Sequence, residues 1–262
     1  MISRLLQKIK GIKKAQKYFE RLFKLSLAGM NYGIGGNFKD SGELNTFKYI
    51  KNKFEGEENL VIFDVGANVG KYSLDLSDFF GNKTTIHSFE PSQKTFAMFL
   101  ENTKEKTNIL SNNFGLSDIE NEKLLYTDAD GSGLASVYKR NLEHFNISLS
   151  KSEKIKLSTV DNYCEKNKIK KIHLLKLDVE GHELSALKGA QKMIKDKKID
   201  FIQFEFGGCN IDSRTYFQDF FYILKDDFRI YRILKDGLHE IPEYKETLEI
   251  FVTTNYLAEA RK

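Results

Sequence analysis

The feature that most constrains the fold is an apolar run that leads directly into a glycine-containing turn. Leu60–Val65 (LVIFDV) is followed by residues 66–70 (GANVG), and a helical pattern of apolar residues then begins. Glycine permits a tight turn between a strand and a helix because it lacks a Cβ atom and adopts positive φ values. The segment therefore predicts a buried strand, a turn and a helix, the first unit of an α/β sheet.

Short apolar runs and helical patterns alternate along much of the chain after this turn. The runs are typical of strands buried on both faces and cover residues 60–65, 85–89, 172–179 and 200–206. The helical patterns cover residues 70–80, 92–105, 183–197 and 213–226. This alternation predicts a Rossmann-like α/β fold, with a mostly parallel twisted sheet and helices on both faces.

Three regions depart from the alternation. Residues 121–160 contain short apolar runs and the turn DADGSG, which predict an antiparallel insertion or a loop excursion. Near the C-terminus, residues 229–234 and 247–254 are expected to form an antiparallel strand pair. Residues 29–42 are rich in glycine and polar residues, so they are expected to form a connecting loop or a lid.

The N-terminal segment concentrates positive charge. Residues 1–25 hold eight basic residues and one acidic residue, a net charge of +7; because the whole chain carries +4, the remainder carries −3. Apolar residues recur in this segment at steps of three or four, as on one face of a helix: Ile2, Leu5, Ile9, Ile12, Ala15, Phe19 and Leu22. We expect residues 1–36 to form a basic amphipathic helix and its connector, and residues 37–262 to form one domain. The helix is expected to pack on that domain or on a second subunit, with docking on an anionic membrane as the alternative.

Composition restricts the class of protein. Hydrophobic residues make up 40% of the 262 residues and charged residues 30%, as in a soluble globular protein. The part of the chain after residue 25 is slightly acidic, which argues against a nucleic-acid-binding surface. Cys164 and Cys209 form no CxxC pair and are interpreted as buried thiols of a reducing compartment. The sequence shows neither a bilayer-spanning run nor a secretory signal, so we expect a cytoplasmic protein, peripheral at the inner face of the membrane if its first segment binds lipid.

Polar residues at the ends of two strands predict a nucleoside-binding site. Asp64, Gly66, Asn68 and Gly70 lie in the first turn, where the N-terminus of the next helix offers free N–H groups to an anionic ligand. Their spacing departs from the G-x-G-x-x-G pattern of dinucleotide enzymes, and no GK[ST] phosphate loop follows. Glu90 ends the second strand, where an acidic side chain accepts hydrogen bonds from ribose hydroxyls. Together these features favour S-adenosyl-L-methionine over NAD.

Two later segments add candidate site residues. In residues 112–118 (NNFGLSD), Asn113 is expected to reach the adenine edge, with Phe114 packed on the ring; an asparagine-rich turn is the alternative.

The run LLKLDVEGHE, residues 174–183, places Lys176 and Asp178 on one face of a strand, where the lysine needs a carboxylate partner. His182 is either a base near neutral pH or a locally hydrogen-bonded structural residue. Glu205, at the end of the next strand, lies beside Asp178 if the two strands are neighbours. Asp178, His182 and Glu205 are therefore the candidate catalytic residues, and two carboxylates alone are too few ligands to predict a metal.

The motifs DVGANVG, FEPS, NNFGLSD and LLKLDVEGHE, in this order, resemble the FkbM family of methyltransferases over about residues 38–227. The SGE at residues 41–43 is similar to the family's segment before its first strand. The resemblance implies a class I methyltransferase fold, S-adenosyl-L-methionine as donor, and O-methylation of sugar hydroxyls in glycans or natural products. Carried over by position, the turn residues would line the methionine end and Glu90 the ribose. By the same carry-over, Asp178, Glu180, Gly181 and His182 would border the acceptor.

The sequence thus predicts an S-adenosyl-L-methionine-dependent O-methyltransferase whose acceptor is a sugar or glycan, in a bacterial surface glycan. One alternative is methylation of a small-molecule natural product. A second is a non-catalytic cofactor-binding or membrane-docked accessory protein. Peripheral membrane contact or dimerisation is expected through residues 1–25, and no nucleic-acid partner is expected.

Overall fold

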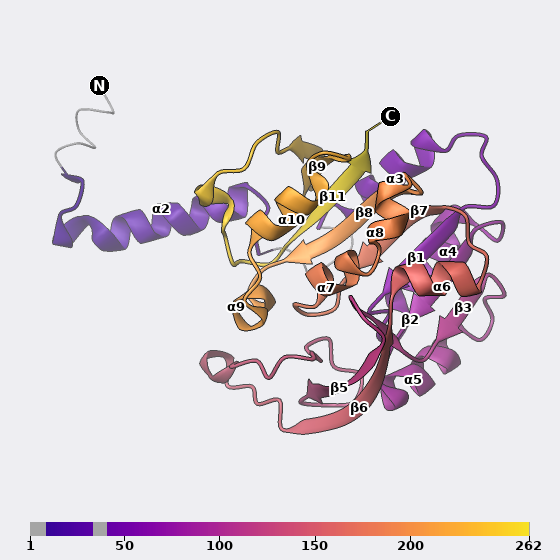
Figure 1. Cartoon of the computed structure of the whole chain (residues 1–262). Coiled ribbons are helices and arrows are strands. Elements are labelled where there is room, and N and C mark those ends of the chain that lie inside the picture. Colours follow the sequence, from indigo (N-terminus) through magenta and orange to yellow (C-terminus); the bar gives the residue numbers. More distant parts are fainter. Residues whose placement is uncertain (1–8, 34–40, 262) are drawn as a thin grey trace.

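The structure, a computed structural model, describes residues 9–33 and 41–261. Its centre is an eight-stranded sheet in the order β10-β9-β11-β8-β7-β1-β2-β3 (Figure 1). In chain order the strands of this sheet are β1 (Val61–Val65), β2 (Thr85–Phe89), β3 (Ile109–Asn112), β7 (Ile172–Leu177), β8 (Ile199–Phe206), β9 (Phe228–Leu234), β10 (Gly237–Glu240) and β11 (Thr254–Ala260). The predicted Rossmann-like, mostly parallel sheet is confirmed.

The order of the strands creates a switch point in the middle of the sheet. The chain moves outward through the parallel pairs β1–β2 and β2–β3, then returns to place β7 on the other side of β1. β8 continues parallel to β7. The connection from β1 to β2 and the connection from β7 to β8 run in opposite directions along the sheet. The loops after β1 and β7 therefore diverge and open a crevice at the carboxyl ends of these strands.

The C-terminal part of the sheet is antiparallel, and one predicted strand is displaced. β11 pairs antiparallel with both β8 and β9, as expected for the final strand pair. The prediction of a strand over 247–254 is wrong, because Glu246–Leu248 is a 3-10 helix and the strand begins at Thr254. Glu249 explains the displacement: its carboxylate accepts the backbone N–H groups of Phe217 and Gln218 at the start of a neighbouring helix, which holds this segment away from the sheet.

Helices cover both faces of the sheet, and two predicted helices are interrupted. The helices are α3 (Glu43–Lys53), α4 (Lys71–Phe80), α5 (Gln93–Thr103), α6 (Val160–Lys166), α7 (Glu183–Lys188), α8 (Gln191–Lys195), α9 (Cys209–Ser213) and α10 (Phe217–Leu224). The helix expected over 183–197 is divided into α7 and α8 at Gly189, where a Cβ atom would lie 2.0 Å from the carbonyl oxygen of Ser117. The helix expected over 213–226 is shorter and begins only at Phe217.

Alternating side chains of the central strands fill two separate cores. Ile62 of β1 and Leu174 of β7 pack with residues of α3 and α4 on one face. Phe63 and Leu175, the next residues of the same strands, pack with α6, α7, α8 and α10 on the other face. Because both faces are covered, the strands read as continuous apolar runs.

The region 121–160 forms the predicted antiparallel insertion. β5 (Asn121–Thr127) pairs antiparallel with β6 (Lys151–Ser158), and β4 (Gly115–Leu116) completes a three-stranded sheet in the order β4-β6-β5. A long excursion between β5 and β6 contains the 3-10 helix Glu143–Phe145. Figure 1 shows this small sheet below the central sheet, next to the carboxyl ends of its parallel strands.

The N-terminal region differs in part from the expected helix. A 3-10 turn, Lys13–Ala15, precedes α2 (Gln16–Gly29), so the helix begins later than the apolar stripe predicted. The part of the stripe in residues 1–8 lies outside the described residues, as do residues 34–40, which include the predicted boundary at residue 36. Within the described ranges no helix is long and apolar enough to cross a bilayer. Both cysteines are free and buried, as predicted.

Candidate active site

A cavity of about 430 Å³ lies at the switch point, within the size range of small-molecule sites. The first turn, the tip of β2, the end of β7 and the three-stranded sheet all contribute to it. Five of the nine predicted site residues line the cavity: Gly66, Asn68, Glu90, Asp178 and His182. The other four lie outside its lining: Asp64, Gly70, Asn113 and Glu205.

The turn after β1 is held by its glycines and by Glu90. Gly66 has a φ of +82°, and a Cβ atom there would lie 1.8 Å from the carbonyl oxygen of Asp178. Residue 66 must therefore lack a side chain because the backbone of Asp178 lies against it, and not only because a ligand approaches, as the sequence suggested. Gly70 has a φ of +92° and faces Phe99 and Thr103 of α5 instead of the cavity. Both glycines thus shape the turn that presents Asn68.

Glu90 combines a buried carboxylate with remaining hydrogen-bonding capacity. Its Oε2 accepts the N–H of Asn68 at 3.0 Å, and its Oε1 accepts the N–H of Ser92 at 2.8 Å. Each carboxylate oxygen has a second lone pair, so both can still accept a ligand hydroxyl. Burial raises the pKa of Glu90 to about 7, although the two backbone N–H groups lower it. The geometry fits a group that holds the two hydroxyls of a ribose.

Asp64 lies beneath the cavity, where it anchors a lysine. The Lys176 ammonium is 3.1 Å from Asp64 Oδ1 and 3.4 Å from Asp178 Oδ2, which confirms that this lysine pairs with carboxylates. Burial lowers the pKa of Lys176, but the two aspartates outweigh burial and raise it overall. Asp64 also accepts the Ser73 hydroxyl at 2.6 Å. Because Asp64 is fully buried, its contribution is to hold Lys176, which itself lines the cavity.

A polar network that the sequence analysis missed extends from Lys176 to the start of α3. The ammonium lies 4.7 Å from the centre of the Tyr72 ring, and Tyr72 donates its hydroxyl to Gln203 at 3.0 Å. Gln203 in turn donates to Glu43, which also accepts the Ser41 hydroxyl. Glu43 and Tyr72 both line the cavity. The SGE motif at 41–43 was the available signal for Glu43, but only the fold brings it to the switch point.

The insertion supplies an apolar wall that the sequence analysis also missed. Leu125 of β5 and Ile155 and Leu157 of β6 are buried, form one cluster and line the cavity. Asn68, in the first turn, donates a hydrogen bond from its side-chain amide to the carbonyl oxygen of Ser132 at 2.9 Å. Ser132 follows β5, so this bond connects the insertion to the first turn. The short apolar runs of this region predicted an insertion, but only the fold shows which element these side chains cover.

His182 lies in a chain of hydrogen bonds. The Ser117 hydroxyl donates a hydrogen bond to Asp118 at 2.8 Å, so its oxygen accepts a hydrogen bond from the Nε2–H group of His182 at 2.9 Å. The other ring nitrogen, Nδ1, then accepts the Tyr138 hydroxyl at 3.0 Å. Burial lowers the pKa of His182 to about 4, so the ring is neutral near pH 7. Both nitrogens are occupied, which fits the structural alternative raised for this residue.

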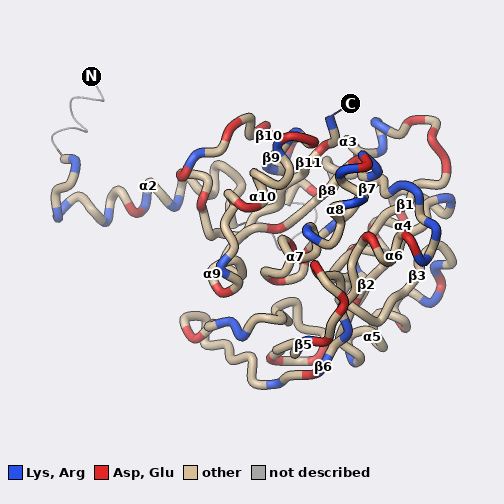
Figure 2. The backbone as a smooth tube through the Cα atoms, viewed as in Figure 1, with Lys and Arg blue, Asp and Glu red and all other residues tan. Residues whose placement is uncertain are grey.

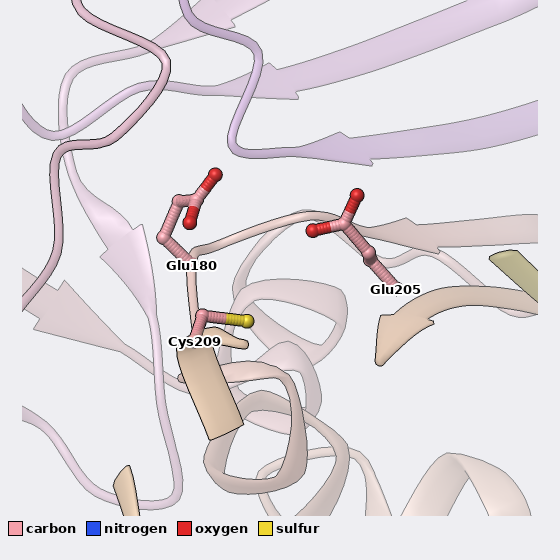
Figure 3. Close-up of side chains that lie close together, drawn as sticks. All are labelled: Glu180, Glu205 and Cys209. Atoms are coloured by element: carbon pink, nitrogen blue, oxygen red, sulfur yellow. The ribbon is translucent and has the colours of Figure 1, made fainter. Parts of the chain in front are cut away.

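Glu205 faces Glu180 and Cys209, as Figure 3 shows. Of these three residues, Glu180 lines the cavity. One ligand atom from each of these three residues lies within 4.8 Å of the others, a spacing that could hold a metal ion. Arg140 already forms an ion pair with Glu180 and lies 3.7 Å from Asp212. Burial, followed by the charge of Asp178, raises the pKa of Glu180 to about 8 and that of Glu205 well above its ordinary value. Both carboxyl groups therefore hold their protons to a higher pH than an exposed carboxyl group does.

Asn113 and Phe114 have roles in the fold instead of a place in the cavity lining. The Asn113 amide donates to the carbonyl oxygens of Glu90 and Pro91 at 3.0 and 3.3 Å, which fixes the loop after β2. The Phe114 ring packs on Phe89 and Tyr163 in the core, so it is not available to an adenine. The turn alternative describes this segment better than the ligand-contact prediction.

Comparisons with known proteins identify methyltransferases that are similar to this chain. The hexuronic acid methyltransferase AglP of Haloferax volcanii is 29% identical over 154 residues, 58% of this chain and 59% of that protein. A solved FkbM methyltransferase from Methylobacillus flagellatus has a TM-score of 0.47 and 19% identity, covering 77% of this chain and 43% of that one. An S-adenosylmethionine-dependent O-methyltransferase from Thermotoga maritima has a TM-score of 0.43 and 11% identity, covering 83% and 66% of the two chains.

The match to the family model covers the greater part of the chain. The model of the methyltransferase FkbM domain matches residues 64–233, from the last residues of β1 to the end of β9. This range contains the first turn, Glu90, the insertion and the whole segment from Lys176 to Glu205. The chain therefore belongs to the FkbM methyltransferase family.

Proposed function

We propose that this methyltransferase transfers a methyl group from S-adenosyl-L-methionine to a hydroxyl of a sugar in a bacterial surface glycan. The observation that carries the proposal is that one cavity joins Glu90 at the tip of β2 to Asp178 at the end of β7. A nucleoside held at Glu90 would extend across the switch point toward Asp178. The relative that acts on a hexuronic acid, although matched over only 59% of its length, supports a sugar acceptor.

The residues present fit S-adenosyl-L-methionine. Glu90 would accept the ribose hydroxyls, and the turn at Gly66 and Asn68 would lie along the methionine part. Lys71 begins α4 at the cavity, where free N–H groups favour an anionic carboxylate. When bound, the cofactor supplies an electrophilic methyl group on a sulfonium. The protein's own task is then to orient an acceptor oxygen and to exclude water.

Asp178 is the strongest candidate for the group that receives the acceptor's proton. Its side chain is 43% exposed at the cavity, and Lys176 orients its carboxylate. His182 is better suited to positioning neighbouring groups, because both of its ring nitrogens are engaged in hydrogen bonds. Glu205 acts through Glu180, which lines the cavity. The apolar wall from Leu125, Ile155 and Leu157 would keep water out.

The decisive experiment is formation of S-adenosylhomocysteine with a panel of glycans that includes neutral hexoses and hexuronic acids. Asp178→Asn should lower turnover by about 10²–10⁴-fold with little change in cofactor affinity. Asp219→Asn, on the surface at the start of α10, serves as a matched carboxylate control. Full turnover in Asp178→Asn would remove this residue from the reaction. Binding of NAD without binding of S-adenosyl-L-methionine would reject the proposal altogether.

A further inference from the structure

The helix α2 projects from the body of the protein (Figure 1). Of its fourteen residues only Leu27, near its C-terminal end, is buried. Phe23 and Leu25 are 60% and 69% exposed, and Tyr18 is 57% exposed. Large apolar side chains that remain exposed on a single helix require another surface to cover them.

The root of this helix is fixed to the sheet. Asn31 donates its side-chain amide to the carbonyl oxygen of Ile233 in β9, and its own carbonyl oxygen accepts the Thr254 hydroxyl of β11. Tyr32 is buried and accepts a hydrogen bond from Arg232 at 3.0 Å. Because residues 31 and 32 are held in this way, α2 is an anchored arm of the domain.

The arm has two opposite faces. At 100° per residue, an apolar sector gathers Tyr18, Phe19, Leu22, Phe23 and Leu25. The basic side chains of the helix, Lys17, Arg21 and Lys24, lie on the opposite side, and its one acidic residue is Glu20. Figure 2 shows the basic positions continuing toward the N-terminus, where Lys13 and Lys14 are also exposed. An apolar sector with aromatic side chains and a basic face is the pattern of a helix that lies in a membrane interface.

We propose that α2 docks the enzyme on an anionic lipid surface, with its apolar sector inserted among the acyl chains and its basic residues at the headgroups. The charge of α2 favours an anionic lipid surface over a second copy of the chain as its partner. A second α2 would bring three further basic residues and one acidic residue, so the basic face would gain no complementary partner. Anionic headgroups complement that face, and each basic residue near such a surface adds to the attraction.

The test is flotation of the full-length chain with phosphatidylcholine vesicles, with and without 30% phosphatidylglycerol. Flotation is expected with the anionic vesicles at low salt and should fall at high salt, because the charges are screened. Lys17→Ala with Lys24→Ala should weaken binding about 30-fold. Phe23→Ser with Leu25→Ser should abolish flotation. Because all four side chains are exposed, these variants should retain the wild-type unfolding midpoint.

Matched controls are available elsewhere on the surface. Lys192→Ala with Lys195→Ala, on exposed positions of α8, and Ile119→Ser, at an exposed apolar residue, should leave flotation unchanged. Failure of the wild-type chain to float at low salt would overturn the proposal. So would equal binding to neutral and anionic vesicles. A lipid-free dimer that Phe23→Ser with Leu25→Ser converts to a monomer would assign the sector to a second copy instead.

Discussion

The Lys176 ammonium lies 3.1 Å from the Asp64 carboxylate, and the two residues are direct partners in the register of β7 and β1. This buried pair joins the two strands between which the sheet changes direction. It also carries the charge that orients Asp178 at the cavity. The stability of the central sheet and the chemistry of the candidate site therefore depend on the same ammonium group.

Removing one member of this pair should destabilise the fold strongly. Lys176→Met leaves the Asp64 carboxylate buried without its counter-charge, and we expect a loss of about 3–5 kcal/mol in the free energy of unfolding. Lys176→Met with Asp64→Leu should lose much less, because Ser73 can turn its hydroxyl to Ser88 at 2.8 Å. Denaturant unfolding measures both. Lys83→Met, which breaks an exposed pair with Glu58, is the control and should cost at most about 1 kcal/mol. An equal loss in the single and double variants would contradict the argument.

Two of the glycines that line the cavity, Gly66 and Gly133, should respond differently to substitution. Gly66→Ala places a Cβ atom against the Asp178 carbonyl at positive φ, so we expect a loss of about 3 kcal/mol or more. Gly133→Ala, at a cavity glycine with no heavy atom within 4 Å of its ideal Cβ, should remain near wild-type stability. Thermal unfolding of the two variants is the measurement. Wild-type stability in Gly66→Ala would show that the turn can move away from β7.

Cofactor affinity should depend on pH through Glu90. Its pKa of about 7 means that the carboxylate is largely protonated at pH 6. Since ribose hydroxyls donate to the charged form, affinity for S-adenosyl-L-methionine should rise as the pH increases, by up to about tenfold between pH 6 and 8. Calorimetric titration at both pH values measures the change.

Glu90→Gln separates this group from the other acidic residues of the site. The variant should bind S-adenosyl-L-methionine more weakly by about 1.5–3 kcal/mol at pH 8, because it lacks the charged acceptor. Its affinity should also be nearly independent of pH over this interval. Unchanged affinity at pH 8 would mean that the ribose lies elsewhere, and an unchanged pH profile would assign the titration to another carboxyl group.

The neutral state of His182 should make stability sensitive to acid. Its pKa is about 4 in the folded protein against 6.5 in the unfolded chain, so the unfolded state binds the additional proton first. With respect to this group, the free energy of unfolding keeps its full value above pH 6.5. It decreases as the pH falls toward 4, at up to about 1.4 kcal/mol per pH unit. Urea unfolding between pH 7 and 5 should show a smaller slope in His182→Gln than in the wild type.

Local patterns in the sequence were sufficient for the order and type of the main elements. The run at 60–65 and the glycines after it determine a strand and a turn, because backbone preferences and the pattern of apolar residues are properties of short segments. The positions of Glu90 and Asp178 at strand ends followed in the same way, since parallel strands align their carboxyl ends. The need of Lys176 for a carboxylate was likewise visible, because an unpaired buried charge is costly in any fold.

Tertiary structure decided which of these residues share the cavity. Asp64 and Gly70 stand in the same motif as Gly66 and Asn68, but their side-chain positions face the core and α5, a direction that neighbouring strands and helices set. Glu43, Tyr72 and the wall at Leu125 come from segments far apart in the sequence, so no local pattern could join them to the site. The strand expected over 247–254 was displaced because Glu249 is held by the start of α10, a long-range contact that outweighs the local preference for extended chain.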